Sequence, residues 1–294
     1  MTTRNTNSAR AAHLDEFYVG YLPLPAGHGA FLRRLLVGGV LLVAVVALMA
    51  LAQRSPGRGV WHDAAPREWV GTLVASPYPM LVVASEPRDE ARPSAEPWRT
   101  MLLVEAGKHG SQPRTRDLNS ARVRVKGFLI ERDGRRLIEL APGDDALTRL
   151  DDVPPEKASE LDTTPSLISS DTALVGELLD AKCFLGAMKP GDRRAHAGCA
   201  RLCIAGGIPP LLGTRGPDGV ARVVLVASIL DDGLAPLQAA HLPLVGQPAR
   251  YQGAVYRVGD LEILVTERAD RVPRAAMLAS RESLCNFSEP ATRE

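Results

Sequence analysis

The chain is poor in aromatic residues, net charge and cysteine. Only 4% of its 294 residues are aromatic, the formal net charge is +1, and there are four cysteines. A nearly neutral chain lacks the overall basic field that attracts nucleic acid. Four cysteines are too few for a small disulfide-stapled scaffold. Apolar residues at 45% and charged residues at 23% are ordinary for a globular protein and exclude global disorder.

The common catalytic motifs are absent as well. The sequence has no Gly-x-Ser-x-Gly elbow, no P-loop, no dinucleotide-binding fingerprint and no His-Glu-x-x-His pair. It also lacks the Cys-x-x-Cys redox motif and the Cys-x-x-Cys-His haem-attachment motif. No catalytic residues are therefore predicted, and we expect a binding or accessory protein rather than an enzyme.

One long uncharged run divides the chain. Residues 35–52 read LLVGGVLLVAVVALMALA and follow Arg33-Arg34. As a helix this run would span about 27 Å, close to the thickness of a bilayer's hydrocarbon core. A cleaved signal peptide is the main alternative, but a 34-residue leader is too long for one. We expect a single transmembrane helix over 35–52, preceded by a short cytoplasmic tail over 1–34. Residues from 53 onward are placed outside the cytoplasm, because this is the usual form of a signal anchor.

The part after the run contains the same strand pattern twice. Residues 69–74 (WVGTLV) match residues 174–179 (LVGELL), and the hairpin at Asp133-Gly134 matches the one at Gly259-Asp260. An isolated glycine in a strand indicates a sharp bend, which small closed barrels need at their corners. Five short strands per half, the first of them bent, resemble the OB-fold, a small Greek-key barrel. Another antiparallel β architecture is the alternative.

We therefore expect a mostly β protein with two tandem OB-like small β-barrels after a single N-terminal transmembrane helix. The expected barrels cover residues 67–145 and 172–270. Residues 146–171 between them are rich in Asp, Glu and Pro and are expected to form a solvated acidic linker. Residues 271–294 are expected to form a C-terminal tail.

The two halves differ in one place. The interval from Gly176 to Gly253 is 21 residues longer than the matching interval from Gly71 to Gly127. The additional residues lie at 183–210, which we expect to be inserted between the first and second strands of the second barrel. Residues 195–204 predict a helix in this insertion, ended by the glycine pair at 206 and 207.

The insertion carries Cys183, His196, Cys199 and Cys203. The last three are spaced i, i+3 and i+7, so they share one helical face that Cys183 can reach from the end of the first strand. Thiolates with an imidazole suit copper or zinc, and the same cysteines suit thiol redox chemistry. The spacing is not a known zinc pattern.

A structural disulfide is the alternative use of these cysteines. It would join Cys183 to Cys199 or Cys203, because a bond between cysteines on adjacent helical turns is strained. Cys285, in the C-terminal tail, could pair with the remaining one. Four cysteines after the apolar run suit an oxidising compartment. Both uses of the cysteines stay open.

Residues 176–210 contain the motif G-x-x-x-D-x-x-C, followed by H-x-x-C-A-x-x-C-I-x-G-G-I-P-P. With this motif the segment resembles an uncharacterised family of bacterial secreted or membrane-anchored proteins. The resemblance implies a bacterial inner-membrane protein with periplasmic domains. It does not imply any activity. An anchor and two interaction-type barrels without a catalytic constellation predict a membrane-anchored periplasmic binding or accessory protein, a subunit or assembly factor of a membrane redox complex. Its expected partners are the membrane and other subunits, not nucleic acid. The alternative is a copper- or zinc-binding or thiol redox protein.

Overall fold

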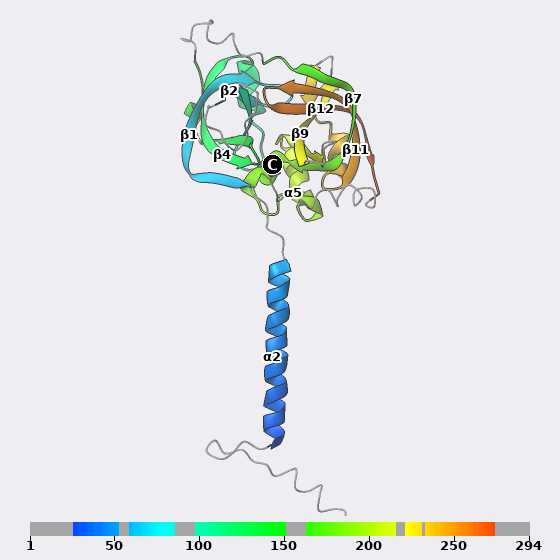
Figure 1. The fold of residues 1–294 in the computed structure, drawn as a ribbon. Helices are drawn as coiled ribbons and strands as arrows, with labels where there is room; N and C mark the ends of the chain where they lie inside the picture. Colours follow the sequence, from blue (N-terminus) through cyan, green and yellow to red (C-terminus); the bar gives the residue numbers. More distant parts are fainter. Residues whose placement is uncertain are drawn as a thin grey trace, which may run out of the picture. The chain divides into compact units, whose positions relative to one another are not determined.

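A computed structural model describes residues 26–52, 59–85, 98–150, 163–215, 221–230 and 233–273. The chain divides into two compact units, Met1–Ser55 and Pro56–Glu294, which are described separately. Among the described residues, the first unit contains helix α2 and the second contains the strands (Figure 1).

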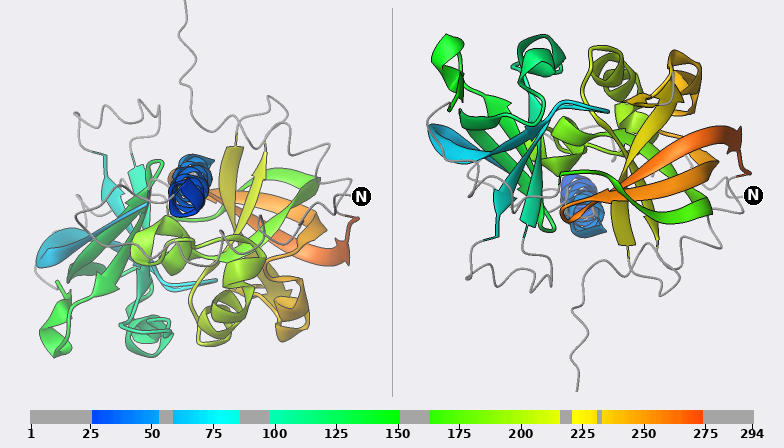
Figure 2. Two further views of the ribbon diagram at one scale, coloured as in Figure 1. Left: turned by 90° about the horizontal axis from the view of Figure 1, so that it is seen from below. Right: turned by 90° about the horizontal axis from the view of Figure 1, so that it is seen from above.

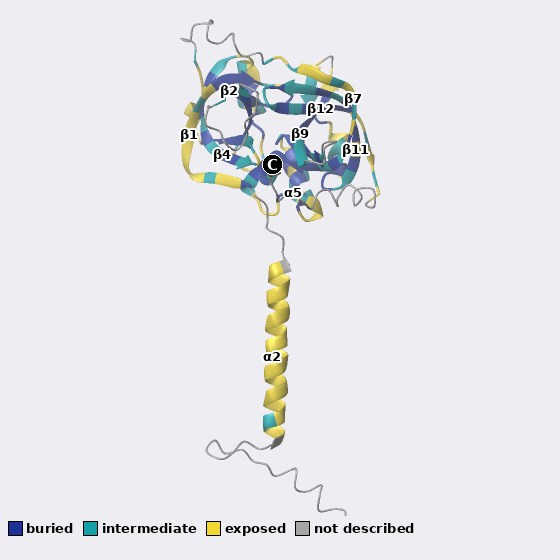
Figure 3. Cartoon of the chain, in the orientation of Figure 1, coloured by how far each residue is buried: buried dark blue, intermediate teal, exposed yellow. Residues whose placement is uncertain are grey.

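Helix α2 (Ala26–Ala52) is exposed along almost its whole length (Figure 3). Its segment Gly27–Leu51 is long and apolar enough to cross a membrane, a property that an N-terminal signal sequence shares. The helix begins nine residues before the expected start at 35. Arg33 and Arg34 limit how deep a segment can lie in a bilayer, but arginine is a good helix former and does not stop the helix. Residues 1–25 of the expected tail lie outside the described residues.

The first half of the second unit forms a closed five-stranded barrel. Its strands are β1 (Val60–Val74), β2 (Met80–Ala84), β3 (Trp98–Val104), β4 (Arg122–Arg132) and β5 (Arg135–Leu140). They are ordered β1-β2-β3-β5-β4, and β4 closes the barrel on β1. Only the β3–β5 pair is parallel among these strands. A short strand, β6 (Leu147–Arg149), extends the sheet beside β4.

The second half repeats this topology. Its strands are β7 (Ser166–Asp180), β8 (Pro210–Arg215), β9 (Ala221–Leu230), β11 (Pro248–Val258) and β12 (Leu261–Arg271). They are ordered β9-β12-β11-β7-β8, closed by β8 on β9, with β9 and β12 parallel. β10 (Gly233–Pro236) extends β9. The predicted fold class, two OB-like barrels after an apolar helix, is confirmed.

Short helices complete both halves at matching positions. Between the third and fourth strands, the first barrel has α3 (Gln112–Thr115) and the 3-10 turn η1 (Arg116–Leu118). The second barrel has the 3-10 turn η4 (Ala239–Leu244) at the same place. Another 3-10 turn, η2 (Asp144–Ala146), precedes β6.

The matching glycines lie where a neighbouring strand passes closely. A Cβ atom on Gly71 of β1 would collide with the carbonyl oxygen of Val82 in β2. A Cβ on Gly176 of β7 would collide in the same way with the carbonyl oxygen of Gly213 in β8. The glycine in each first strand is therefore required by the close approach of the second strand.

The strands extend beyond the expected domain boundaries. β1 begins at Val60 rather than 67, because its first residues pair with the end of β4. β6 and the first residues of β7 lie inside the segment 146–171 that was expected to be a linker. In this segment the charged side chains of the described strands are exposed. Composition alone does not distinguish an exposed strand face from a loop. Residues 151–162 and 274–294, including Cys285, lie outside the described residues.

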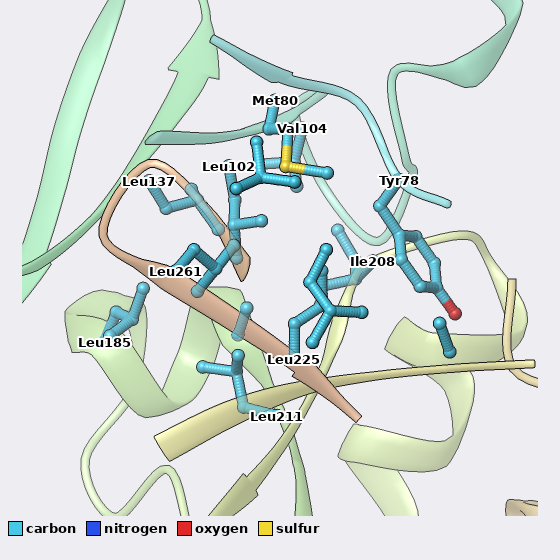
Figure 4. Packing of buried hydrophobic residues seen from close by; sticks show 14 of the residues in the cluster. Tyr78, Met80, Leu102, Val104, Leu137, Leu185, Ile208, Leu211, Leu225 and Leu261 are labelled. Atoms are coloured by element: carbon cyan, nitrogen blue, oxygen red, sulfur yellow. The ribbon is translucent and has the colours of Figure 1, made fainter. Parts of the chain in front are cut away.

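The two barrels share a hydrophobic core. Each barrel has its own interior cluster, and a third cluster takes residues from both. In β3, Leu103 belongs to the interior of the first barrel, whereas Leu102 and Val104 belong to the shared core. In β9, Val226 belongs to the second interior and Leu225 to the shared core. Figure 4 shows Leu102, Val104 and Leu225 among the labelled residues of the shared core. The two barrels lie side by side (Figure 2), and the shared core takes the residues of β3 and β9 that alternate with the interior ones.

Polar contacts reinforce this interface. The Leu237 N–H donates a hydrogen bond of 2.8 Å to the Tyr78 hydroxyl of the first barrel. The Thr100 N–H donates to Asp260 Oδ1 at 2.8 Å, and the Thr100 hydroxyl donates to the Val258 carbonyl at 2.7 Å. OB-folds commonly bind ligands on the face of their second and third strands. In this protein that face of each barrel is covered by the other barrel.

Candidate metal centre

The insertion lies between the first and second strands of the second barrel, the place expected from the sequence. After β7 the chain forms a π-helical turn, η3 (Cys183–Ala187), and then helix α5 (Arg193–Ala205). The Gly207 N–H donates to the Ile204 carbonyl, with Gly207 at a φ of +96°. This is the left-handed conformation that ends helices and favours glycine. The helix is close to the expected range of 195–204.

The structure brings the four expected site residues together. Cys183 begins η3, and His196, Cys199 and Cys203 lie on successive turns of α5. Cys183, His196 and Cys203 are buried, and Cys199 is half-buried. The ligand atoms of Cys183, His196 and Cys199 all lie within 4.8 Å of one another. The same limit holds for Asp180, Cys183 and Cys203, so Cys183 belongs to both groups.

Asp180 is a site residue that the sequence reasoning missed. It is the last residue of β7, and it is fully buried. Its Oδ2 atom lies 2.9 Å from His196 Nε2, and its Oδ1 atom accepts a 2.8 Å hydrogen bond from the Cys183 N–H. The hydrogen bond to Asp180 raises the pKa of His196. A carboxylate at the end of an apolar strand, three residues before Cys183, is the sequence signal that could have identified it.

Lys108 of the first barrel is a second site residue that was not predicted from the sequence. Its Nζ atom lies 2.7 Å from Cys199 Sγ and 3.7 Å from Cys203 Sγ. Its loop packs on the end of α5, where the Gly110 N–H donates a 2.9 Å hydrogen bond to the Gly206 carbonyl. A Cβ on Gly206 would collide with the Lys108 carbonyl. The glycine that the sequence marks as a helix stop thus also lets the first barrel reach the site.

The thiols have different acidities. A hydrogen bond from Cys183, reinforced by the charge of Lys108, lowers the pKa of Cys203 from 9.0 to about 7. Cys183 donates that bond and is buried, so its own pKa is raised well above the usual value. The hydrogen bond to Cys199 raises the pKa of Lys108, which therefore stays charged. These contacts favour the thiolate form of Cys203 and the protonated form of Cys183.

The insertion is also attached to the first barrel beside Cys183. Lys182 forms a buried ion pair with Glu139 of β5, and its Nζ atom donates to the carbonyls of Glu105 and Gly107 at 3.0 and 2.8 Å. On the other side, the Arg132 guanidinium lies 4.1 Å from the centre of the Phe184 ring. The backbone that carries Cys183 is therefore held by residues of both barrels.

The three described cysteines are free thiols. The expected disulfide of Cys183 with Cys199 or Cys203 is therefore not present in this structure. The donor set fits a soft metal ion, since it offers three sulfurs and an imidazole. Because His196 Nε2 contacts Asp180, His196 Nδ1 is the nitrogen left for a metal.

The resemblance of residues 176–210 to a bacterial family stays a prediction. No protein-family model and no curated protein matches this chain.

Proposed function

We propose that this protein is a membrane-anchored binding protein that holds a soft metal ion, copper(I) or zinc, at Cys183, His196, Cys199 and Cys203. The observation that carries the proposal is that the ligand atoms of Cys183, His196 and Cys199 lie within 4.8 Å of one another, and that Cys183 also belongs to a second such group with Cys203 and Asp180. Thiolates and imidazole together are the ligands of many zinc sites, and soft thiolates also select copper(I).

The position of Asp180 supports a metal role for His196. A histidine that binds a metal usually donates its other ring N–H to a carboxylate or carbonyl, which fixes the ring orientation. The contact between His196 Nε2 and Asp180 Oδ2 has this form. The same carboxylate holds the Cys183 backbone, so a single buried group orients two of the proposed ligands.

The charges around the site support thiolate ligands. Metal binding requires deprotonated cysteines, and it releases their protons. Lys108 lies against Cys199 and places a positive charge beside the sulfurs. A nearby cation offsets part of the negative charge that several thiolates leave around a metal ion.

The apolar helix supports the cellular setting in this proposal. We place α2 in a bacterial inner membrane, with the short tail in the cytoplasm and the barrels in the periplasm. There the protein would serve a membrane redox complex as a subunit or assembly factor. Nucleic acid is disfavoured as a partner, because each barrel covers the other's usual OB-fold ligand face.

Metal analysis of the full-length protein in detergent, prepared anaerobically under reducing conditions, tests the proposal. We expect one copper(I) or zinc ion per chain, and cobalt(II) should give sulfur-to-metal charge-transfer absorption. Cys183→Ser should lower both the metal content and this absorption, and Asp180→Asn should weaken metal affinity by about 10- to 100-fold. Cys285→Ser is the matched control, because Cys285 is not among the proposed ligands. Full metal content in both Cys183→Ser and Cys199→Ser would contradict the proposal.

A thiol redox protein is the second candidate. It is favoured by the lowered pKa of Cys203, about 7, next to the Cys183 thiol. A thiolate beside a neighbouring thiol is the arrangement that thiol–disulfide exchange uses. This candidate predicts thiol exchange by protein that contains no metal.

A further inference from the structure

We infer that Cys183 is a redox gate on metal loading: oxidation joins it to Cys199 or Cys203, and the disulfide form does not bind the metal. This inference rests on the proposed metal-binding function and assigns a regulation to the same site. The site would then have two exclusive states, one with a metal on reduced thiolates and one with a disulfide.

The central position of Cys183 carries the inference. It lies in η3, whereas Cys199 and Cys203 both lie on α5. It belongs to both groups whose ligand atoms lie within 4.8 Å of one another. Cys199 and Cys203 are four residues apart on one helix, where parallel side chains make a disulfide strained. A bond at about 2.05 Å is therefore favoured only when Cys183 is one of its partners.

The first exchange step begins at Cys199. It is the most accessible of the three thiols, since Cys183 and Cys203 are buried. The Lys108 ammonium, 2.7 Å away, stabilises the negative charge on the attacking sulfur. The oxidant is a low-molecular-weight disulfide. The Cys199 thiolate attacks one of its sulfurs, its S–S bond breaks, and one thiol leaves, so that Cys199 carries a mixed disulfide.

Cys183 completes the reaction. The Cys183 sulfur attacks Cys199 Sγ and gives up its proton, the mixed disulfide breaks, and the small thiolate that leaves takes up a proton to become the second small thiol. In balance, two protein thiols lose two electrons and two protons, and one small disulfide becomes two thiols. Attack of Cys203 on Cys183 can then move the bond to the buried Cys183–Cys203 pair and release Cys199, with no net oxidation.

Either disulfide removes two of the three sulfurs from the metal site. Only one cysteine and His196 remain, which are too few for a thiolate-rich copper or zinc site. A bound metal conversely keeps the sulfurs coordinated and unavailable for attack. In an oxidising compartment, loading would therefore require reduction of the site, and loading would then protect it.

Oxidised glutathione is the probe that tests the gate. The full-length protein carries Cys285→Ser, so that three cysteines remain, and it is made metal-free and reduced. After oxidation, peptide mapping should find a single disulfide that always contains Cys183. Zinc content after oxidation should fall by at least about tenfold, and reduction should restore one ion per chain. Zinc added before glutathione disulfide should slow thiol loss by a similar factor.

Two variants separate Cys183 from its neighbours. Cys183→Ala should stop at a glutathione adduct on Cys199 and form no Cys199–Cys203 bond. Cys203→Ala should still form the Cys183–Cys199 bond, and serves as the matched control. Thermal denaturation shows whether each variant is folded, and the protection by zinc tests the gate in the unaltered site.

The outcomes distinguish the two proposals. If reduced protein binds zinc and the oxidised protein binds it equally well, the gate is wrong and the metal function stands. A Cys199–Cys203 bond that forms readily in Cys183→Ala would also overturn the gate. If the reduced protein binds neither zinc nor copper(I), the metal function fails, and the gate fails with it. A Cys183-centred disulfide in that case would support the thiol redox candidate.

Discussion

The two barrels have the same strand order and matching glycines, yet they differ in how their first two strands are connected. In the first barrel this connection is residues 75–79, and in the second it is residues 181–209. The short connection places Tyr78 in the shared core. The long connection places Cys183 and Cys203 in the shared core and Cys199 against it. It also carries the buried His196. The comparison shows that the fold supplies a scaffold, and that the candidate chemistry belongs to an inserted segment.

The two barrels are nevertheless not independent of each other at this site. Lys108 and Glu139 of the first barrel contact residues of the insertion. The segment after β3 also approaches the end of α5, through hydrogen bonds to the carbonyls of Gly206 and Gly207. The first barrel therefore acts as a supporting surface for the insertion of the second.

The largest expected effect tests the shared scaffold. Gly253→Ala places a Cβ against the Val265 carbonyl of the neighbouring strand, so backbone atoms must move. We expect a loss of about 3 kcal/mol or more of unfolding free energy, measured by urea denaturation. Gly127→Ala makes the same collision with the Glu139 carbonyl in the first barrel and should be equally harmful.

Gly198→Ala is the control for these substitutions. Gly198 is exposed on α5, and a Cβ there meets nothing within 4 Å. Alanine in a helix is favoured over glycine by about 1 kcal/mol, so this variant should be more stable. If Gly253→Ala were tolerated like Gly198→Ala, the close strand approach would not explain the repeated glycines.

An effect of similar size tests how the insertion is held by the first barrel. Lys182→Met keeps the length of the side chain but leaves the buried Glu139 carboxylate without its partner. Breaking a buried ion pair in this way costs about 3–5 kcal/mol of unfolding free energy. The double variant Lys182→Met/Glu139→Leu should recover much of the loss, because no unpaired charge remains.

Lys126→Met is the matched control for the ion pair. Lys126 lies 3.4 Å from Asp145 of the same barrel, with the Lys126 side chain 38% exposed and the Asp145 side chain 70% exposed. Exposed pairs contribute about 0–1 kcal/mol. A cost for Lys182→Met no greater than that for Lys126→Met would show that the insertion does not depend on this contact.

The sequence predicts the repeated barrel well because its signals are local. Strand patterns, the two hairpin turns and the matching glycines report on residues near each other in the chain. The continuous apolar run at 101–104 and the similar run at 223–227 also contain a signal for the shared core. Strands buried on both faces lose polar alternation. Periodicity does not identify the covering element, however, so the packing of barrel on barrel could not be predicted.

The candidate site could be predicted only in part, for the same reason. His196, Cys199 and Cys203 share a helical face, and helical spacing alone brings them together. Lys108 comes from another barrel, and its contact with Cys199 depends on packing that no local pattern encodes. Asp180 is adjacent to the insertion, but its burial and its contact with His196 follow from how α5 folds back on β7.

A smaller effect compares one buried tyrosine from each barrel. The Tyr78 hydroxyl accepts the Leu237 N–H across the interface, whereas the Tyr251 hydroxyl has no hydrogen-bond partner among the described residues. Tyr78→Phe should cost about 1–3 kcal/mol of unfolding free energy, because it leaves a buried N–H unpaired. Tyr251→Phe should be neutral or stabilising. Equal costs for the two variants in thermal or urea denaturation would contradict this assignment of the Tyr78 contact.

The smallest effect concerns protonation, and it tests whether the first barrel tunes the site of the second. The pKa of Cys203 is lowered from 9.0 to about 7, so its thiolate forms at lower pH in the folded state than in the unfolded chain. Its contribution to stability is therefore full above about pH 9 and is lost as the pH falls through about 7. Thiolate absorbance of the metal-free protein, minus that of Cys203→Ser, should show a midpoint near pH 7.

Lys108→Met should raise this midpoint, because the cation that favours the Cys203 thiolate comes from the first barrel. Lys126→Met is the control, since that lysine pairs with Asp145 and not with a thiol. The Cys183 hydrogen bond is the larger cause of the lowered pKa, so Lys108→Met should return the midpoint only part of the way toward 9. A midpoint that does not move would mean that the first barrel supports the insertion by packing alone, and a midpoint at 9 would assign the whole effect to Lys108.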